Sequence, residues 1–430
     1  MSRTAGIART RPGSAEPDVL VIGGGIIGVC TAYYLARGGA AVTLLEEHQV
    51  GGPMASSYGN IGLLVPSHST PVAEPGVIGR GLRWLFNPDS PLYIRPRADA
   101  DLVRWLLRFR AACTADRCAA AEPILRRWQM ASLELFAELA AELPPEVNFE
   151  HKGGLFLYRE EPSWEEAVAA VRAEQDEGID VAVVEPAELR ALVPGLLPSV
   201  IGAVHYRGDG RIIPDRFVRA MAAAAAERGA MIHEHATVFG LERRGRAVQA
   251  VHTSLGTMQP RTVVLATGSV SPRLGRDAGL RIPVQPAKGY SITVRRPPVC
   301  PDIPLHLHDE RVVITPFGPD RMRMGGTLEL AGDNRSVNLR RVAAVRRAPP
   351  RYLEGMQELE VLEIWRGMRP LSADTLPILG RAKGVRNLVL ATGHGMIGVS
   401  LGPATGRAAA EVVLGEPPSL DPTLFRADRF

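Results

Sequence analysis

The stretch from Asp18 to Gly28, DVLVIGGGIIG, constrains the fold of this chain more than any other. An apolar strand runs into a glycine-rich turn, and the turn opens a predicted helix that ends near Gly38. In such a unit Gly23 makes the tight turn, Gly25 lets a pyrophosphate approach the backbone, and Gly28 lets the helix pack on the strand. The helix N-terminus also offers N–H groups and a partial positive charge to phosphates. The unit therefore predicts dinucleotide binding.

A second predicted strand, residues 41–45, ends in an acidic residue, Glu46. A carboxylate at this point can accept hydrogen bonds from both hydroxyl groups of an adenosine ribose, and it would repel a 2′-phosphate. The sequence therefore disfavours NADP. It does not distinguish FAD from NAD, because both cofactors carry the same adenosine half.

The chain has 430 residues, of which 46% are hydrophobic, enough for two or three folding units with large cores. Its formal net charge is +4 and its basic residues are dispersed along the sequence, which disfavours nucleic-acid binding. Only three of the 50 basic residues are lysines, namely Lys152, Lys288 and Lys383. Because a buried lysine can lose its proton and an arginine cannot, each lysine is a candidate for chemistry.

The four cysteines and ten histidines show no metal-ligand spacing, so no metal site is predicted. The cysteines show no paired arrangement, which indicates a reducing, cytoplasmic compartment. Residues 1–17 are polar and lack an apolar segment, so we expect a disordered leader and not a signal peptide. No run reaches the ~18 apolar residues that a membrane-spanning helix needs. A peripheral contact with the inner face of a membrane stays open, as does a homo- or hetero-oligomer.

Pieces of a nucleotide-binding fold recur far along the chain. The predicted strands at 263–268 and 387–393 both end in Ala-Thr-Gly, and a last helix is expected to follow residues 394–398 and to end near Leu414. The segments between are rich in strands and helices, including a helix over 163–177 with Ser163 as N-cap. We therefore expect an α/β fold, α+β overall, in which a discontinuous Rossmann-like domain carries an inserted antiparallel-sheet domain that binds the substrate. The nucleotide-binding segments are predicted at 18–85, 200–282 and 366–430, and the substrate-binding segments at 86–199 and 283–365.

Short motifs spread over nearly the whole chain point to one family. They are VIGGGIIG at 21–28, SSYGNIG at 56–62, VVLATG at 263–268, PAKGYS at 286–291, GGTLE at 325–329, GMRP at 367–370, GHGMIG at 393–398 and PATG at 403–406. On these motifs the chain resembles the FAD-dependent D-amino-acid oxidase, glycine oxidase and sarcosine oxidase superfamily. The KGYS segment and the serine-rich segment with Asn60 favour its D-amino-acid dehydrogenase branch.

This resemblance implies FAD as the cofactor. It is expected to be non-covalent, because the usual attachment segments contain no cysteine; His394, beside the expected flavin position, stays open as an attachment point. Residues 393–398 are expected to bring a second helix N-terminus near the flavin, where its dipole would stabilise negative charge on reduced flavin. The cofactor-binding residues implied by the glycine unit and the resemblance are Gly23, Gly25, Ile26, Ile27, Gly28, Glu46, Glu47, Ser56, Ser57, Asn60, Ile61, Val238, Ala266, Thr267, Gly268, Gly393, His394, Gly395, Met396, Ile397 and Gly398.

The family reaction moves a hydride from the Cα of an amino acid to flavin N5, and the imine then hydrolyses in water. The resemblance implies that Arg369, in GMRP, binds the substrate carboxylate, a task that suits a bidentate guanidinium; Arg366 is the alternative. Tyr290 is expected to donate its hydroxyl to the carboxylate or to form a wall above the flavin, unless it is a core residue. Lys288 lies on the same strand face and is expected to stabilise reduced flavin, unless it is a surface lysine. The turn at 394–397 contains no arginine or lysine. Glycine oxidase-like members of the family have a positive group near this turn, so its absence weakens the case for a glycine or sarcosine substrate.

Three functions stay open on the sequence. The first is FAD-dependent oxidative deamination of a D-amino acid, with a D-proline or 4-hydroxy-D-proline type substrate in view and a quinone or carrier as electron acceptor. The second is a glycine- or sarcosine-type amine oxidase that uses O₂. The third is the flavin subunit of a hetero-oligomeric amino-acid dehydrogenase, and a catalytically silent flavin-binding protein is a weaker fourth.

Overall fold

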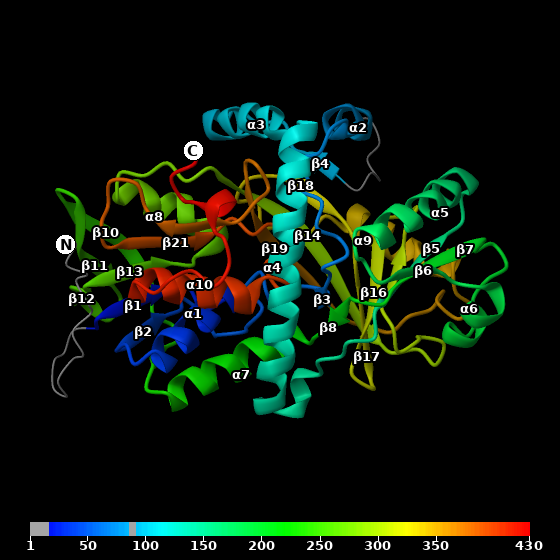
Figure 1. The fold of residues 1–430 in the computed structure, drawn as a ribbon, viewed down its shortest axis with the longest axis horizontal. Helices are drawn as coiled ribbons and strands as arrows, with labels where there is room; N and C mark the ends of the chain where they lie inside the picture. Colours follow the sequence, from blue (N-terminus) through cyan, green and yellow to red (C-terminus); the bar gives the residue numbers. More distant parts are fainter. Residues whose placement is uncertain (1–16, 86–91) are drawn as a thin grey trace.

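The computed structural model describes residues 17–85 and 92–430, and Figure 1 shows two sheet regions separated by one long helix. The predicted leader therefore lies, apart from its last residue, outside the described residues. The left-hand region in this view contains a six-stranded sheet with its helices, and the right-hand region contains a larger sheet. The long helix, α4, crosses between them.

The six-stranded sheet is the nucleotide-binding fold that the glycine-rich unit predicts. Its order is β20-β21-β13-β1-β2-β9, and the five strands from β21 to β9 run parallel. The bounds are β1 Val19–Ile22, β2 Val42–Leu45, β9 Met231–His233, β13 Thr262–Leu265, β20 Ile378–Arg381 and β21 Leu388–Thr392. Near-continuous burial of β1, β2 and β13 explains why these strands are apolar throughout.

Helices α1 (Ile26–Arg37), α7 (Pro214–Glu227) and α10 (Gly402–Leu414) pack around this sheet and share one core with α4 (Ala115–Glu142). Helices α1 and α10 approach each other closely. A Cβ on Gly406 would lie 2.4 Å from the Cβ of Cys30, so glycine lets the two helices meet. A smaller antiparallel sheet of β10 (Val238–Arg244), β11 (Ala247–Thr253) and β12 (Gly256–Met258) lies beside the six-stranded sheet.

The large mixed sheet is built around β14 (Val284–Arg295), which pairs with β17, β18 and, along nearly its whole length, β19. Its path is β4-β18-β14-β17-β16-β15-β5-β7-β6, with β19 (Val361–Ser372) paired to β14 off this path. The other bounds are β4 Leu92–Ile94, β5 Gly154–Tyr158, β6 Val181–Val183, β7 Gly202–Tyr206, β15 Leu305–Leu307, β16 Val312–Phe317, β17 Arg321–Gly325 and β18 Leu328–Leu330. A short pair, β3 (Leu63–Leu64) with β8 (Gly210–Arg211), completes the strands.

The remaining helices pack on both sheet regions or lie at the edge of the molecule. They are α2 Val77–Leu85, α3 Ala100–Ala112, α5 Glu161–Asp176, α6 Pro186–Leu192, α8 Ser271–Asp277 and α9 Leu339–Arg347, with 3-10 turns at Pro145–Val147, Gly268–Val270, Pro349–Arg351 and Thr423–Phe425. Figure 1 shows α2 and α3 at one edge of the molecule, above the sheets in this view.

Several expected boundaries differ from the structure. Helix α5 begins at Glu161 with Glu160 as its N-cap, because Pro162 fits the first turn, so Ser163 is not the cap. Strand β7 belongs to the large sheet, which places 202–206 on the substrate side of the predicted boundary at 200. Strand β19 continues through the predicted boundary at 366 as far as Ser372. Pairing with other strands sets the limits of β7 and β19, and the local sequence does not show these limits.

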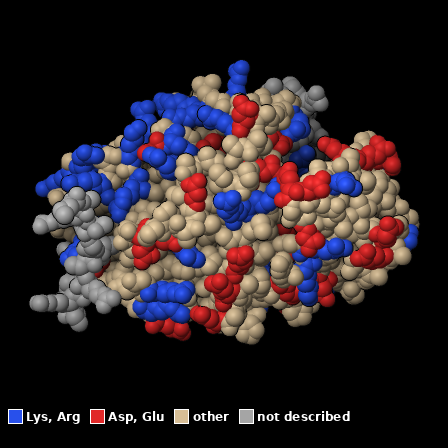
Figure 2. All heavy atoms as spheres, viewed as in Figure 1, with Lys and Arg blue, Asp and Glu red and all other residues tan. Residues whose placement is uncertain are grey.

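Figure 2 shows acidic and basic side chains interspersed over much of one face, with basic side chains gathered at the upper left. This region lies over α3, α8 and β10 in the same view. In the part of the chain that the structure describes, no helix combines the length and apolar character needed to cross a bilayer.

Candidate functional site

A pocket lies between the carboxyl ends of the parallel strands and strand β19. Together with its mouth it encloses about 1510 Å³. The parallel-strand side contributes the turns after β1, β2, β13 and β21, and the other side contributes residues 365–370 of β19. In an open α/β sheet, ligands bind outside the carboxyl ends of the strands, so this is the position expected for a dinucleotide.

The turn after β1 depends on two glycines for its shape. Gly23 has φ +107°, and a Cβ there would lie 2.6 Å from the carbonyl oxygen of Ala266. A Cβ on Gly28 would lie 1.8 Å from the carbonyl oxygen of Gly23, so the first turn of α1 can press against the loop only without a side chain. These contacts hold the N-terminus of α1 open toward the pocket.

Glu46 lies in the pocket wall, where its carboxylate already shapes the loop around it. One oxygen accepts a hydrogen bond from the N–H of Gly24 at 2.6 Å, and the other accepts from the N–H of His48 at 2.9 Å. Each carboxylate oxygen has a second lone-pair direction. Glu46 can therefore fix the glycine turn and still accept hydrogen bonds from a ribose.

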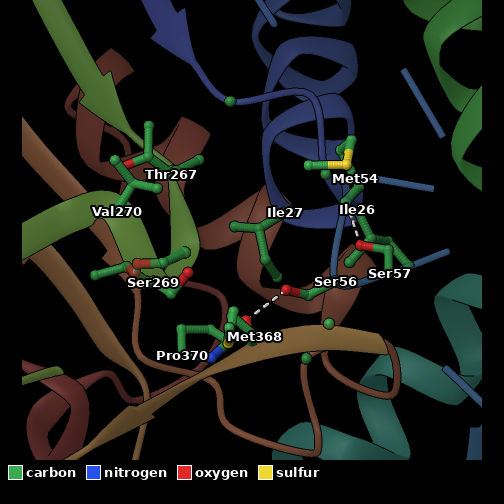
Figure 3. Close-up of a pocket in the computed structure, with 18 of the residues that line it drawn as sticks. Ile26, Ile27, Met54, Ser56, Ser57, Thr267, Ser269, Val270, Met368 and Pro370 are labelled. Carbon is green, nitrogen blue, oxygen red and sulfur yellow. Dashed lines mark hydrogen bonds between the residues drawn. The ribbon is translucent and has the colours of Figure 1, made fainter. Parts of the chain in front are cut away.

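Two serines link the pocket walls, as Figure 3 shows. The Ser57 hydroxyl accepts a hydrogen bond from the N–H of Ile26, the first residue of α1, at 3.1 Å. The Ser56 hydroxyl donates to the carbonyl oxygen of Met368 in β19 at 2.6 Å. The loop at 56–57 thus ties the glycine turn to the large sheet across the pocket, opposite Thr267, Ser269 and Val270.

Most of the predicted cofactor-binding residues line this pocket. They are Gly23, Gly25, Ile26, Ile27, Glu46, Glu47, Ser56, Ser57, Asn60, Val238, Ala266, Thr267, Gly268, His394, Gly395, Met396 and Gly398. Four do not: Gly28 lies behind Gly23, Ile61 approaches Gly325, and Gly393 and Ile397 are outside the lining. Residues 393–398 form turns, and the expected last helix, α10, follows them from Gly402 to Leu414. The helix N-terminus therefore begins four residues after the segment that was expected to bring it to the flavin.

Arg369 lies in the pocket wall, and its guanidinium fills the space above a glycine of the neighbouring strand. A Cβ on Gly289 would lie 1.6 Å from Nη1 of Arg369. The same nitrogen donates to the carbonyl oxygen of Thr327 at 3.2 Å. Burial lowers the pKa of Arg369 to about 10, so it stays a cation at neutral pH. Among the described residues it has no carboxylate partner, which leaves most of its donors to a ligand.

The structure corrects the expected roles of Lys288 and Tyr290, which do not line the pocket. They flank Gly289 and so point to the opposite face of β14 from the one that Arg369 covers. Both are buried, at 1% and 0% exposure, against a third buried residue, Glu329. Lys288 is 3.3 Å from one oxygen of this carboxylate, and the Tyr290 hydroxyl donates to the other at 2.9 Å. Burial in this network raises the pKa of Tyr290.

His394 touches the pocket, but its imidazole is engaged elsewhere. It is buried, and its Nε2 lies 3.1 Å from the hydroxyl of Thr405 in α10. Burial lowers the pKa of His394 to about 3, so it is neutral near pH 7. The four cysteines, Cys30, Cys113, Cys118 and Cys300, lie outside the pocket lining. In the residues that the structure describes, no group of three or more His, Cys, Asp or Glu could hold a metal ion.

The sequence did not identify Trp365, which forms part of the pocket wall. Its indole N–H donates to the carbonyl oxygen of Pro53 at 2.7 Å. A Cβ on Gly59 or on Gly367 would lie 1.9 Å from the ring, so two glycines from distant segments make room for it. The sequence does contain a glycine, Gly367, two residues after this tryptophan, and this spacing was the one feature that could have indicated the position of the ring. Arg335 and Arg366 also line the pocket.

These residues fit an adenine dinucleotide with a flavin. The glycine turn and the N-terminus of α1 suit a pyrophosphate, and Glu46 suits the ribose hydroxyls. The pocket lining extends from the turns after β1 and β2 to residues 365–370 of β19, as a ligand of this length requires. The wall of β19 and the turn at 394–399 would enclose the flavin half.

Comparisons with known proteins agree with this geometry. A family model described as FAD dependent oxidoreductase matches residues 18–412. A D-amino acid dehydrogenase of Paramagnetospirillum magneticum is 34% identical over 421 residues, covering 96% of this chain and 98% of that protein. A D-amino acid dehydrogenase of Methylobacterium radiotolerans is 32% identical over 408 residues, covering 94% and 97%.

Solved structures share the fold. The glycine oxidase of Geobacillus kaustophilus superposes with a TM-score of 0.78 at 24% identity, covering 96% of this chain and 99% of that one. The glycine oxidase of Bacillus cereus gives 0.75 at 25% identity, covering 95% and 97%. Because the family model spans most of the chain and the curated relatives above 30% identity cover it almost completely, this chain belongs to the FAD-dependent oxidoreductase family.

Proposed function

We propose that this enzyme catalyses the FAD-dependent oxidative deamination of a D-amino acid. The observation that carries the proposal is the Arg369 guanidinium, held in the pocket wall over Gly289 without a carboxylate partner among the described residues. A cation held this way suits the carboxylate that every amino acid carries. The D-amino acid dehydrogenases among the relatives support the D-configuration.

The chain's own residues contribute mainly position and charge. Arg369 would hold the carboxylate, while its bond to Thr327 and its fit over Gly289 fix its direction. When bound, FAD supplies the acceptor for the hydride that leaves the substrate Cα. The acidic side chains of the described lining, Glu46 and Glu47, follow β2 on the nucleotide side, and His394 is neutral. The substrate amine therefore loses its proton to water before oxidation, and the imine product is hydrolysed by water.

Trp365 and the serine-linked loop contribute enclosure. The indole of Trp365 packs between Gly59 and Gly367, and Ser56 bonds Met368 across the pocket. These contacts close the wall beside the expected flavin half, which limits the access of water to the reacting atoms.

Cofactor attachment and electron acceptor are also part of the proposal. The FAD is non-covalent, since no cysteine lines the pocket in the described residues and His394 bonds Thr405. The electrons pass to a quinone or carrier, in the cytoplasm or at the inner face of the membrane. D-proline or 4-hydroxy-D-proline remains the specific substrate proposed from the sequence.

The experiment is an activity screen with two readouts. Purified holoenzyme is given D-amino acids, their L-enantiomers, D-proline, 4-hydroxy-D-proline, glycine and sarcosine, with either a quinone analogue dye or O₂ as acceptor. Dye reduction with D-amino acids and little hydrogen peroxide is the expected result. Peroxide formation with glycine or sarcosine would contradict the proposal and support the amine oxidase function. We include this alternative because glycine oxidases at 25% and 24% identity share the fold.

A further inference from the structure

The face of the large sheet that carries Arg369 also carries a row of polar side chains. The strand register sets Thr293 of β14 opposite Arg323 of β17 on one side and opposite Glu363 of β19 on the other. Residues directly opposite each other in a sheet point to the same face, and so do alternate residues of one strand. Glu363 therefore shares a face with Trp365 and Arg369, which line the pocket. The row thus continues the sheet face that forms this wall of the pocket.

Arg323 is the buried cation of this row. It is 2% exposed, and its Nε donates to the hydroxyl of Thr293 at 3.0 Å. The guanidinium carbon lies 4.4 Å from the ring centre of Phe317 and 5.6 Å from that of Tyr58. Its Nη2 is 3.8 Å from a carboxylate oxygen of Glu363. Because a buried cation is costly unless its charge and its donors are engaged, these contacts hold the guanidinium in one place.

One nitrogen of Arg323 binds the loop that crosses above the sheet. Its Nη1 donates to the backbone carbonyl oxygens of Tyr58 and Asn60, at 2.5 and 3.1 Å. The Tyr58 hydroxyl donates to Glu363 at 2.9 Å, which fastens the same loop to β19. Residues 58–60 are therefore held to two strands of the large sheet by one guanidinium and one carboxylate.

The loop that Arg323 binds is also the one that joins the two sides of the pocket. Ser56, Ser57 and Gly59 line the pocket, and the Ser57 hydroxyl accepts from the N–H of Ile26 at the start of α1. The two carbonyl oxygens that Arg323 binds lie on either side of Gly59 in the chain. A displacement of the guanidinium would therefore move these carbonyls, and with them the two serines that precede them.

We propose that Arg323 is a positioning residue for the FAD, acting through the loop at 56–60 while its own side chain stays outside the pocket lining. Its planar donors set the position at which Ser57 meets the start of α1, and Tyr58 with Glu363 completes the clamp. This role depends on FAD, the cofactor of the family, and not on the identity of the substrate.

The test compares two arginines of the large sheet that have the same kinds of partner. Arg296, which follows β14, donates to the carbonyl oxygens of Gly318 and Cys300 at 3.1 and 3.0 Å and pairs with Asp302. All four of these residues lie outside the pocket lining. Arg323→Lys and the control Arg296→Lys each keep the charge and lose the planar donors that bridge two carbonyls. A merely structural role predicts the same outcome for both variants.

The first readout is the Kd of FAD, measured by equilibrium dialysis of the purified holoenzymes against buffers of decreasing FAD concentration. Arg323→Lys should raise this Kd by about tenfold, and Arg296→Lys should leave it at the wild-type value. Tyr58→Phe removes only the bond to Glu363 and should raise it by about threefold. This milder variant decides the matter if Arg323→Lys does not fold. Equal changes in both lysine variants, or wild-type affinity in Tyr58→Phe, would overturn the proposal.

The second readout is the circular dichroism of the bound flavin in its visible absorption bands, recorded with saturating FAD and corrected for free FAD. A displaced loop changes the surroundings of the cofactor, so the spectrum of Arg323→Lys should differ from that of the wild type while Arg296→Lys matches it. A wild-type spectrum in Arg323→Lys would contradict the positioning role. Neither measurement contains an amino acid, so a failure of the proposed deamination would be a separate result.

Discussion

The position of Arg369 depends on a neighbouring glycine that has no side chain. The guanidinium occupies the space that a side chain at Gly289 would fill. Among the described residues it pairs with no carboxylate, and it donates a hydrogen bond to the backbone carbonyl oxygen of Thr327. A buried cation in this state gains from an anionic ligand, because the ligand restores part of the solvation that burial removed. This geometry supports our proposal that Arg369 binds the substrate carboxylate.

Replacing Arg369 tests this preparation. Arg369→Leu should raise KM and lower kcat/KM by roughly 10²-fold, from ~3 kcal/mol of lost charge-assisted binding. Arg369→Lys keeps the charge but loses the planar pair of donors, so a smaller loss is expected. Steady-state kinetics with a D-amino acid measure both, and wild-type kinetics in the leucine variant would remove Arg369 from the site.

Glu46 supports a second prediction at this scale. Glu46→Ala removes the acceptors for Gly24, His48 and a ribose, so FAD should be retained less well. Glu46→Gln keeps one acceptor oxygen, so its FAD retention should lie between that of the wild type and that of Glu46→Ala. The absorbance ratio of flavin to protein after extensive dialysis measures retention. An alanine variant as yellow as the wild type would contradict the ribose role.

At the scale of elements, the pairing of β14 with β19 builds the large-sheet side of the pocket, where we propose that the substrate binds. The register sets Ala287 opposite Arg369 and Gly289 opposite Gly367, which leaves a gap in the side-chain layer for the guanidinium. Gly289 of the KGYS motif is therefore required because any side chain there would overlap the Arg369 guanidinium. Its backbone is not in the left-handed region, so its own conformation does not require glycine.

A substitution in β14 tests this arrangement. In Gly289→Ala the new Cβ would overlap the Arg369 guanidinium and displace it, so kcat/KM should fall by up to ~10²-fold with FAD still bound. Gly208→Ala is the matched control, because nothing lies within 4 Å of a Cβ there. Unchanged kinetics in Gly289→Ala would show that Arg369 does not act from its position over Gly289.

The same elements show what the sequence could and could not predict. The apolar runs before Gly23 and Gly268 predicted the parallel strands correctly, because strand burial and turn glycines leave local patterns. The position of Lys288 and Tyr290 could not be predicted, since it depends on which face of β14 packs against the segment around Asn334 and Ser336. The sequence predicted the last helix after residues 394–398 and its end near Leu414, but it did not give the first residue of α10, because a turn of several residues follows β21.

At the scale of the whole molecule, two sheets built from interleaved segments form one pocket. The family match confirms the predicted superfamily, the FAD cofactor and the oxidoreductase activity, and the glycine oxidase structures confirm the fold class. The assignment of individual pocket residues stays a prediction. Several motifs carried this information because they lie at turns in the pocket wall, as at residues 21–28, 56–62 and 393–398.

We predict that the FAD is bound without a covalent link to the protein. No cysteine lines the pocket within the described residues, and His394 bonds Thr405, so acid precipitation of the purified protein should release all FAD into the supernatant. Flavin fluorescence of the supernatant and the pellet measures the two fractions. Flavin that remains with the pellet would show a covalent link, and His394→Ala would then test its site.

Anaerobic flavin bleaching is the most direct measurement of the central claim, that this pocket oxidises D-amino acids held by Arg369. The absorbance of the enzyme-bound flavin is followed after addition of matched D- and L-enantiomers in the absence of O₂. Rapid bleaching by D-amino acids, little change with the L-enantiomers and a much slower rate in Arg369→Leu are the expected results. Bleaching by L-enantiomers or glycine alone, or a rate that does not depend on Arg369, would contradict the claim.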